Sequence, residues 1–340
     1  MIDNAQMTRP LRKTALASIL FAGAMLAVAV TAKAQQPRKI VRIGYLAGAS
    51  LSANKARVEA LRQGLRDLGY VEGKNLAIEF RWAEVKFERL SAFAAELVGL
   101  KVDVIVTVGA TATLAAKEAT KTIPIVMAQE SDPLGSGFIA SLAHPGGNIT
   151  GLSTLSPEVS GKRLEFLKEI VPRLSRVAVF GTLTSVGGAS GEYLRQTELA
   201  AGAFKVQLQY LDLQESKDIE GAFRAAKTAH ADAALMLGGN VLNSHRTQIV
   251  ELAATNQLPA TYNAPEFVEA GGLMTYGASI PHLHYRAATY VDKILKGAKP
   301  ADLPVEQPTK FEFIINLKAA KQIGLTIPQS VLYKADKVIR

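Results

Sequence analysis

Cysteine is absent from this chain of 340 residues. The absence excludes disulfide bonds and thiol chemistry, and it also excludes a lipid anchor attached to a cysteine after the N-terminal apolar run. The fold must therefore be held by its apolar core alone. A chain of this length, with 48% hydrophobic residues, is large enough to bury such a core.

Motifs for catalysis and for phosphate binding are also missing. The chain has no Gly-x-Ser-x-Gly nucleophile motif and no Walker-type glycine–lysine loop. Of the five histidines, His282 and His284 lie two positions apart on a predicted helix, so their side chains point about 200° apart and would not share a metal ion. We expect both to be solvated or to face the other lobe. We therefore expect no metal, no cofactor and no catalytic residue.

Charge of one sign is not concentrated anywhere. The formal net charge of +9 is spread along the chain without an arginine-rich block. This distribution does not predict a nucleic-acid partner.

The N-terminal segment has the pattern of an export signal. A basic start is followed by an uncharged apolar run and by the small-residue triplet Ala32-Lys33-Ala34, which fits a signal-peptidase site. We expect residues 1–34 to be a signal peptide, with Met1 or Met7 as the start. An uncleaved membrane anchor is the alternative, because the run is nearly long enough to span a bilayer.

Apolar, β-branched runs then alternate with segments of helical period. Strands are predicted at 41–48, 76–84, 102–109 and 123–128, and the pattern restarts with strands at 176–181, 206–213, 231–239 and 258–263. Such alternation predicts parallel βαβ units. The repetition indicates an α/β protein with two similar doubly wound lobes. A last set of strands and helices after 266 is expected to cross back to the first lobe, with a cleft between the lobes.

A glycine-rich stretch lies between the two series of predicted strands and suggests a dinucleotide-binding site. Gly135 to Ala140 fits the fingerprint, but it is separated from the strand before it and only the short segment 137–143 is available as a helix. The next strand offers no Asp or Glu for a ribose, so we reject a dinucleotide site. Asp132 in this stretch is expected either to cap the short helix or to line a pocket.

Several motifs resemble a known family. Residues 131–133 (Ser-Asp-Pro), 145–151 (Pro-Gly-Gly-Asn-Ile-Thr-Gly) and 303–308 (Leu-Pro-Val-Glu-Gln-Pro) closely resemble those of periplasmic substrate-binding proteins of ABC transporters, and the resemblance runs from about Arg42 to the C-terminus. It implies the type I periplasmic-binding-protein fold, with two Rossmann-like lobes, a three-stranded hinge and a central cleft. We expect an N-terminal lobe at 38–152 plus about 275–310, a C-terminal lobe at 153–274, and a crossover segment at 311–340.

The ligand-binding residues are predicted from strand ends, because ligands of open α/β sheets bind beyond the carboxyl ends of the strands. Thr111 is expected to cap a helix, to bind ligand, or both, and Tyr262 and Tyr276 to stack on a flat ligand or to pack at the lobe rim. The absence of Arg and Lys from these strand ends in the first lobe argues against a multiply charged phosphate. The predicted set is Ala49, Ser50, Gly109, Ala110, Thr111, Gln129, Ser131, Asp132, Thr184, Asn240, Tyr262, Asn263 and Tyr276.

The expected function is capture of a small solute and its delivery to an inner-membrane permease. We expect an amino acid, aromatic or otherwise hydrophobic, as the ligand and a periplasmic monomer as the binding protein. The resemblance adds that relatives include binders of tryptophan and other aromatic amino acids. A sensory protein that docks on a receptor and an enzyme on a Rossmann-like fold are the alternatives.

Overall fold

The first lobe is built on a parallel sheet of five strands. The computed structural model describes residues 40–154, 157–183 and 191–340, so the predicted signal peptide lies outside it. The strand order is β2-β1-β3-β4-β5, and all pairings are parallel. The strands are β1 (Val41–Ala47), β2 (Leu76–Trp82), β3 (Val104–Val108), β4 (Ile125–Glu130) and β5 (Ile149–Ser153).

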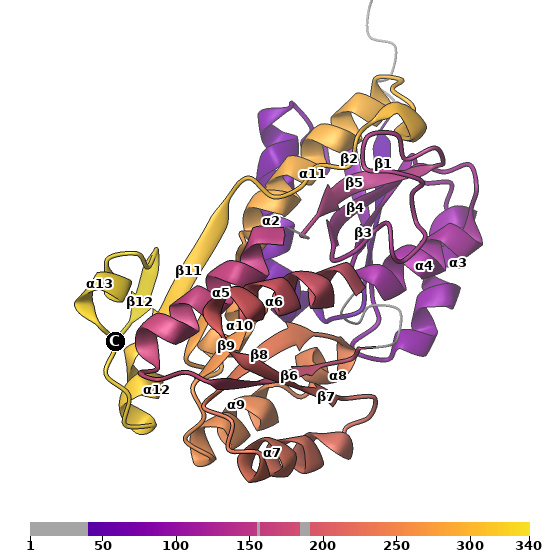
Figure 1. Ribbon diagram of the computed structural model, residues 1–340. Helices are drawn as coiled ribbons and strands as arrows, with labels where there is room; N and C mark the ends of the chain where they lie inside the picture. Colours follow the sequence, from indigo (N-terminus) through magenta and orange to yellow (C-terminus); the bar gives the residue numbers. More distant parts are fainter. Residues whose placement is uncertain (1–39, 155–156, 184–190) are drawn as a thin grey trace, which may run out of the picture. The chain divides into compact units, whose positions relative to one another are not determined.

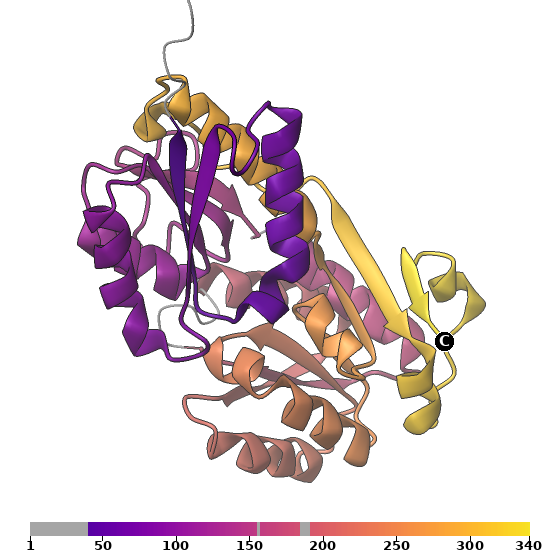
Figure 2. The same cartoon turned by 180° about the vertical axis from the view of Figure 1, so that it is seen from behind.

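Helices cover both faces of this sheet (Figure 1). The apolar side chains of α2 and α11 pack on one face, and those of α3 and α4 on the other, because alternate strand residues point to opposite sides. Figure 2 shows α2 running beside α11, although they are far apart in the sequence. The helices are α2 (Leu51–Asp67), η1 (Phe87–Arg89), α3 (Leu90–Gly99), α4 (Ala110–Ala119), α11 (Ile280–Leu295) and η2 (Pro300–Asp302).

The second lobe contains a sheet of seven strands in the order β12-β11-β10-β9-β8-β6-β7. Only β10 and β11 pair antiparallel. Helices α5 and α6 pack on one face and α7 and α9 on the other. The strands are β6 (Arg176–Gly181), β7 (Gln207–Asp212), β8 (Ala233–Gly238), β9 (Ala260–Tyr262), β10 (Met274–Ala278), β11 (Phe311–Asn316) and β12 (Lys337–Ile339). The helices are α5 (Pro157–Ile170), α6 (Gly191–Phe204), α7 (Asp218–Thr228), α8 (Asn240–Ser244), α9 (Arg246–Thr255), α10 (Pro265–Glu269), α12 (Leu317–Gln322) and α13 (Gln329–Leu332).

The chain crosses between the sheets after β5, after β10 and before β11, which confirms the expected two-lobed fold with a three-stranded hinge. Backbone hydrogen bonds tie these crossings together. The N–H of Ser153 donates to the Glu306 carbonyl (2.8 Å), and the N–H of Ser279 donates to the Lys310 carbonyl (2.9 Å). The hinge is therefore a hydrogen-bonded bundle of extended chain.

Two details of the lobe boundaries differ from the expected ranges. β10 pairs with β9 and β11 in the second sheet, so the return to the first lobe falls after Ala278 instead of near 275. The segment 311–340 supplies β11 and β12 to the same second sheet. It is an edge of that sheet and not a separate crossover.

The predicted short helix at 137–143 is wrong. The segment forms consecutive turns, in which the N–H of Gly137 donates to Leu134 (2.9 Å) and that of Phe138 to Pro133 (3.0 Å). Gly137 has a φ of +66°, which is incompatible with a right-handed helix. Within the described part of the chain, no helix is both long and apolar enough to cross a membrane.

Candidate functional site

A cavity of about 460 Å³ lies between the carboxyl edges of the two sheets. Its walls come from the segments after β1, β3 and β4 in the first lobe and after β8, β9 and β10 in the second. This is the location that the strand-end rule predicts. Among the predicted residues, the cavity brings together Ala49, Gly109, Ala110, Thr111, Gln129, Ser131, Asp132 and Asn263.

Other predicted residues lie elsewhere. Ser50 is at the start of α2, where its carbonyl accepts from the Asn54 side chain (2.9 Å), and it does not line the cavity. Thr184 lies outside the described residues, and Asn240 begins α8 but its side chain is also outside them.

The two tyrosines do not line the cavity either. Tyr262 is buried in the hydrophobic core of the second lobe, where its ring stacks on Phe267 with ring centroids 5.1 Å apart. Tyr276 packs among the rings of Phe166, Phe311 and Phe313. The expectation that these rings stack on a ligand is not met by this geometry, because alternation along β9 and β10 turns both side chains into the core.

The N-terminus of α4 faces the cavity. Gly109 is the N-cap, with a φ of +81° and no side chain to cap the helix, and Ala110 and Thr111 form the first turn. Thr111 is therefore inside the helix and is not its cap. The first N–H groups of an α-helix have no partner within the helix and favour an anion. This end of α4 is suited to a carboxylate.

Asp132 places a buried carboxyl group in the same cavity. Its Oδ1 accepts a hydrogen bond from the N–H of Gly135 (2.8 Å), so it braces the loop after β4 as well as lining the cavity. Next to it, Glu130 Oε1 accepts from the N–H of Ser131 (2.9 Å). Burial raises the pKa of Glu130 to about 7. The two acidic side chains thus have different surroundings, and only Asp132 reaches the cavity.

The strand-end rule missed the charged residues that reach the cavity from helices. Among the described residues, Arg57 on α2, Arg163 on α5 and Arg246 on α9 line it. Arg163 Nε donates to the Tyr276 carbonyl (2.7 Å), and Arg246 Nη1 donates to the Asn243 carbonyl (3.3 Å). The strand ends of the first lobe lack Arg and Lys, but the cavity itself contains arginines. The prediction that excluded a multiply charged ligand on that ground is therefore wrong.

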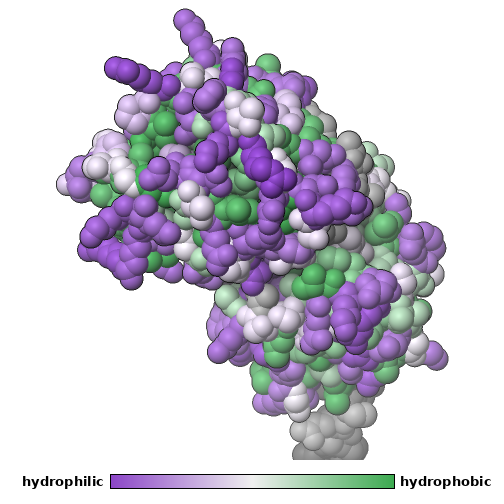
Figure 3. All heavy atoms as spheres, turned by 90° about the horizontal axis from the view of Figure 1, so that it is seen from below, coloured by the Kyte–Doolittle hydropathy of each residue, from purple (hydrophilic) through white to green (hydrophobic). Residues whose placement is uncertain are grey.

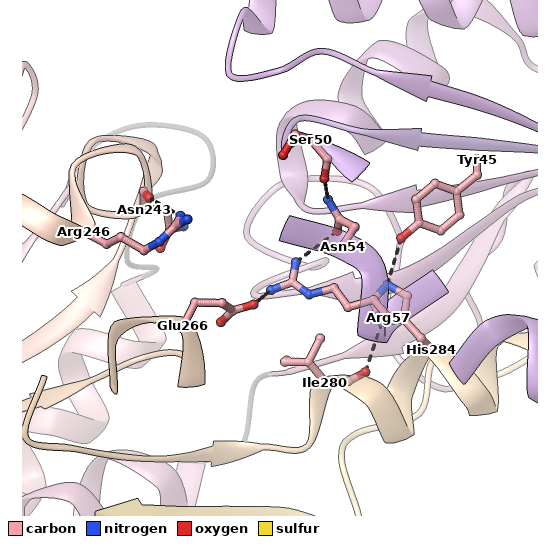
Figure 4. Close-up of polar contacts among 9 residues, drawn as sticks. All are labelled: Tyr45, Ser50, Asn54, Arg57, Asn243, Arg246, Glu266, Ile280 and His284. Atoms are coloured by element: carbon pink, nitrogen blue, oxygen red, sulfur yellow. Dashed lines mark hydrogen bonds and ion pairs between the residues drawn. The ribbon is translucent and has the colours of Figure 1, made fainter. Parts of the chain in front are cut away.

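An ion pair joins the two lobes at the cavity wall. Arg57 of α2 pairs with Glu266 of α10, and it also contacts Asn54 Oδ1 at 3.4 Å (Figure 4). Both ionic side chains are largely buried, with 15% and 26% of their surface exposed. Glu266 Oε2 is buried and has no hydrogen-bond partner among the described residues. A helical-period argument could have found Arg57, because it follows Asn54 by three positions on the same face of α2.

His284 lies beside Arg57 (Figure 4) and is fully buried, contrary to the expectation of a solvated or lobe-facing side chain. Its Nδ1 donates to the Ile280 carbonyl (3.0 Å), so Nε2 accepts from the hydroxyl of Tyr45 (3.3 Å). Burial, with Arg57 nearby, lowers the pKa of His284 to about 3. The neutral ring fixes the start of α11 to β1.

No group of three His, Asp or Glu side chains placed to hold a metal occurs among the described residues. His282 is half-buried on α11, one position from Leu283 and two from His284. The polar part of the cavity lining thus consists of backbone N–H groups, side-chain amides and hydroxyls, carboxylates and guanidinium groups, and apolar side chains form the rest.

The sequence and the fold are similar to those of known binding proteins. A curated relative, a tyrosine-binding protein of Clostridioides difficile (strain R20291), is 27% identical over 292 residues, which are 84% of this chain and 82% of the relative. Two solved structures are similar over most of this chain. A conserved domain protein of Vibrio cholerae has a TM-score of 0.79 and 29% identity over 88% of this chain and all of that one. An ABC domain from Streptococcus pneumonia in complex with L-Trp has a TM-score of 0.77 and 26% identity over 87% of this chain and all of that one.

These similarities cover both lobes and the hinge. The fold is that of the type I periplasmic binding proteins. Residues 43–339 match the sequence model of a single family. The chain therefore belongs to the ABC transporter substrate binding protein family.

Proposed function

We propose that this protein captures an amino acid with an aromatic or other hydrophobic side chain and delivers it to the permease of an ABC importer in the inner membrane. The ligand is held in the cavity between the lobes and leaves it chemically unchanged. No catalytic residue is assigned.

The observation that carries this proposal is the pairing of opposite electrostatic environments in one cavity. The first turn of α4, at Ala110 and Thr111, favours a carboxylate, and Asp132 supplies a carboxyl group for an ammonium. A free amino acid carries both charges. The relatives that bind tyrosine and L-Trp support the same ligand class.

Capture follows from closure of the two lobes. A ligand that contacts residues of both lobes favours the closed form over the open one. Asp132 and Asn263 line the cavity from opposite lobes, and the Arg57–Glu266 ion pair spans the same boundary. The permease would then recognise the closed form.

The proposed place of action is the periplasm, with residues 1–34 as the signal peptide, and the proposed state is a monomer. On the face that Figure 3 shows, hydrophilic side chains cover most of the surface and apolar ones are interspersed among them. Scattered apolar residues are ordinary for a monomer. N-terminal sequencing of exported protein should begin at Gln35, and light scattering should give the mass of one chain.

A thermal-shift panel of amino acids tests the ligand class. Residues 35–340 should melt at a higher temperature with aromatic or branched-chain amino acids than without, because a ligand that binds only the folded state stabilises it. An unchanged melting temperature across the whole panel would remove the amino acid from the proposal.

Transport and its alternatives are separated by what happens after binding. A transport protein should raise the ATPase activity of its reconstituted permease complex, whereas a sensory protein should not. An enzyme would return a changed ligand, and mass spectrometry of the bound fraction detects that change. Recovery of intact amino acid with stimulated ATP hydrolysis is the expected outcome.

A further inference from the structure

The turn after β2 holds an apolar residue in an unusual backbone conformation. Glu84 and Val85 have φ angles of +53° and +68°. Residues other than glycine seldom adopt this left-handed region, and a β-branched side chain there is an outlier. Among the described residues, the non-glycine positions with positive φ are otherwise polar, with unbranched Cβ atoms: Glu84, Lys101, Arg173, Lys205, His230 and Gln257.

The end of β1 holds the turn in this conformation. The N–H of Ala83 donates to the Ala47 carbonyl (3.0 Å), and the N–H of Val85 donates to the Gly48 carbonyl (2.8 Å). Strain of this kind persists only where the surrounding structure fixes it, and it gathers at ligand sites.

Val85 is also unusually exposed for a cavity residue. Among the large hydrophobic side chains that are exposed in the described part of the chain, Val85 is the one that lines the cavity, with 49% of its surface accessible. A glycine at this position would remove both the strain and the exposed apolar surface.

Val85 and two neighbouring residues, Gly48 and Phe87, form what we call the apolar wall of the cavity. The Phe87 ring lies so close to the end of β1 that a Cβ on Gly48 would come within 2.7 Å of Phe87 Cε1. All three residues line the cavity. The charged residues that line the cavity come from other segments of the chain: Arg57, Asp132, Arg163, Arg246 and Glu266.

We propose that Val85 is a specificity-determining residue, and that the apolar wall of Gly48, Val85 and Phe87 receives the apolar side chain of the bound amino acid. The proposal rests on the proposed function. Contact with ligand covers the exposed isopropyl group, which gives the strained valine a role that glycine could not take.

Three variants test it in residues 35–340, with calorimetric titration of L-tryptophan, L-tyrosine, L-phenylalanine and L-leucine as the measurement. Val85→Gly should weaken binding of the tightest of these probes by about three- to tenfold, because it removes apolar contact area. Its ligand-free melting temperature should stay the same or rise by a few degrees, since the strain is relieved. Val85→Thr, which keeps the shape but replaces one methyl group with a hydroxyl, should weaken binding of the same probe without that rise.

Glu84→Gly is the matched control, because it relieves a positive φ in the same turn without lining the cavity. It should keep the affinity of the wild-type protein. Equal affinities in Val85→Gly and the wild type would overturn the role of Val85 while leaving the proposed function intact. Failure of the wild type to bind any of the four probes would overturn both.

Discussion

Single residues at this site combine a structural hydrogen bond with a surface that lines the cavity. Asp132 is the clearest case, because its Oδ1 accepts from Gly135 while the carboxyl group lines the cavity. The position of Asp132 directly after a buried strand was enough to predict from the sequence that it lines the cavity. Arg57, Glu266 and Val85 were not predictable in that way, because their approach to the cavity depends on how helices and turns pack.

The two roles of Asp132 separate in two substitutions. Asp132→Asn keeps an acceptor for Gly135 but loses the charge, so its ligand-free melting temperature should stay within a few degrees of the wild type. Its affinity for the amino acid should fall by about tenfold or more, because a charge-assisted hydrogen bond is lost. Thermal shift and calorimetric titration measure the two effects.

Asp132→Ala removes both the acceptor and the charge. It should lose affinity to a similar extent, with a larger drop in melting temperature than Asp132→Asn. If the asparagine variant binds as tightly as the wild type, Asp132 only braces the loop.

His284 makes stability depend on pH. Its folded pKa of about 3 lies below the unfolded value near 6.5, so the neutral ring stabilises the fold above pH 6.5 and that contribution is lost as pH falls toward 3. The free energy of unfolding should fall by up to about 1.4 kcal/mol per pH unit in this window. Denaturant unfolding of the wild type and of His284→Gln at several pH values isolates the effect.

Glu130 acts in the opposite direction and must be considered in the same experiment. The pKa of Glu130 is about 7 in the folded protein and near 4.5 in the unfolded chain, so the protonated carboxyl group stabilises the fold below pH 4.5. This contribution to the free energy of unfolding is lost as pH rises toward 7. Glu130 is present in both the wild type and His284→Gln, so its contribution cancels in the difference between their free energies of unfolding. A difference between wild type and His284→Gln that does not change with pH would contradict the buried neutral histidine.

At the scale of elements, long periodic segments were predictable and short ones were not. The strand Val104–Val108 lies within the predicted strand 102–109, and the helix Gly191–Phe204 lies between the predicted strands at 176–181 and 206–213, where the alternation places a helical segment. The helix predicted at 137–143 is wrong because the apolar residues of this segment pack its turns against the hydrophobic core of the first lobe. The brief helices α8 and α10 lack enough residues for a period, yet α10 carries Glu266 to the cavity.

The N-terminus of α4 can be tested without breaking the helix. Ala110→Pro replaces the first helical residue, where proline is tolerated, and removes one of the N–H groups that we propose bind the ligand carboxylate. Affinity for the amino acid should fall by about tenfold, since one hydrogen bond to a carboxylate is lost. Far-ultraviolet circular dichroism should stay unchanged.

Ala110→Ser keeps the N–H group and is the control. It should bind nearly as tightly as the wild type. Equal affinities in the proline and wild-type proteins would place the ligand carboxylate away from this end of α4.

For the molecule as a whole, two similar lobes could be predicted because the βαβ pattern restarts. Which helices meet across the cavity could not, because the sequence does not reveal how far the lobes close. The Arg57–Glu266 pair supplies that information, since it joins α2 of the first lobe to α10 of the second.

Removing the charge of this pair should favour the open form. Glu266→Gln retains an acceptor for Arg57 but weakens the attraction, so small-angle X-ray scattering should give a larger radius of gyration for the ligand-free variant than for the wild type. Affinity for ligand should fall as well, because closure becomes less favourable.

Glu269→Gln makes the same change of charge on an exposed position of the same helix. It should match the wild type in both measurements. An unchanged radius of gyration in Glu266→Gln would show that the pair does not govern closure.

Calorimetric titration of residues 35–340 with L-tyrosine and L-tryptophan tests the central claim most directly. The structure and the relatives lead us to expect saturable binding of one ligand per chain to at least one of them, strongly weakened in Asp132→Asn. Absence of binding to either amino acid, or binding that Asp132→Asn and Ala110→Pro both leave unchanged, would contradict amino-acid capture in this cavity.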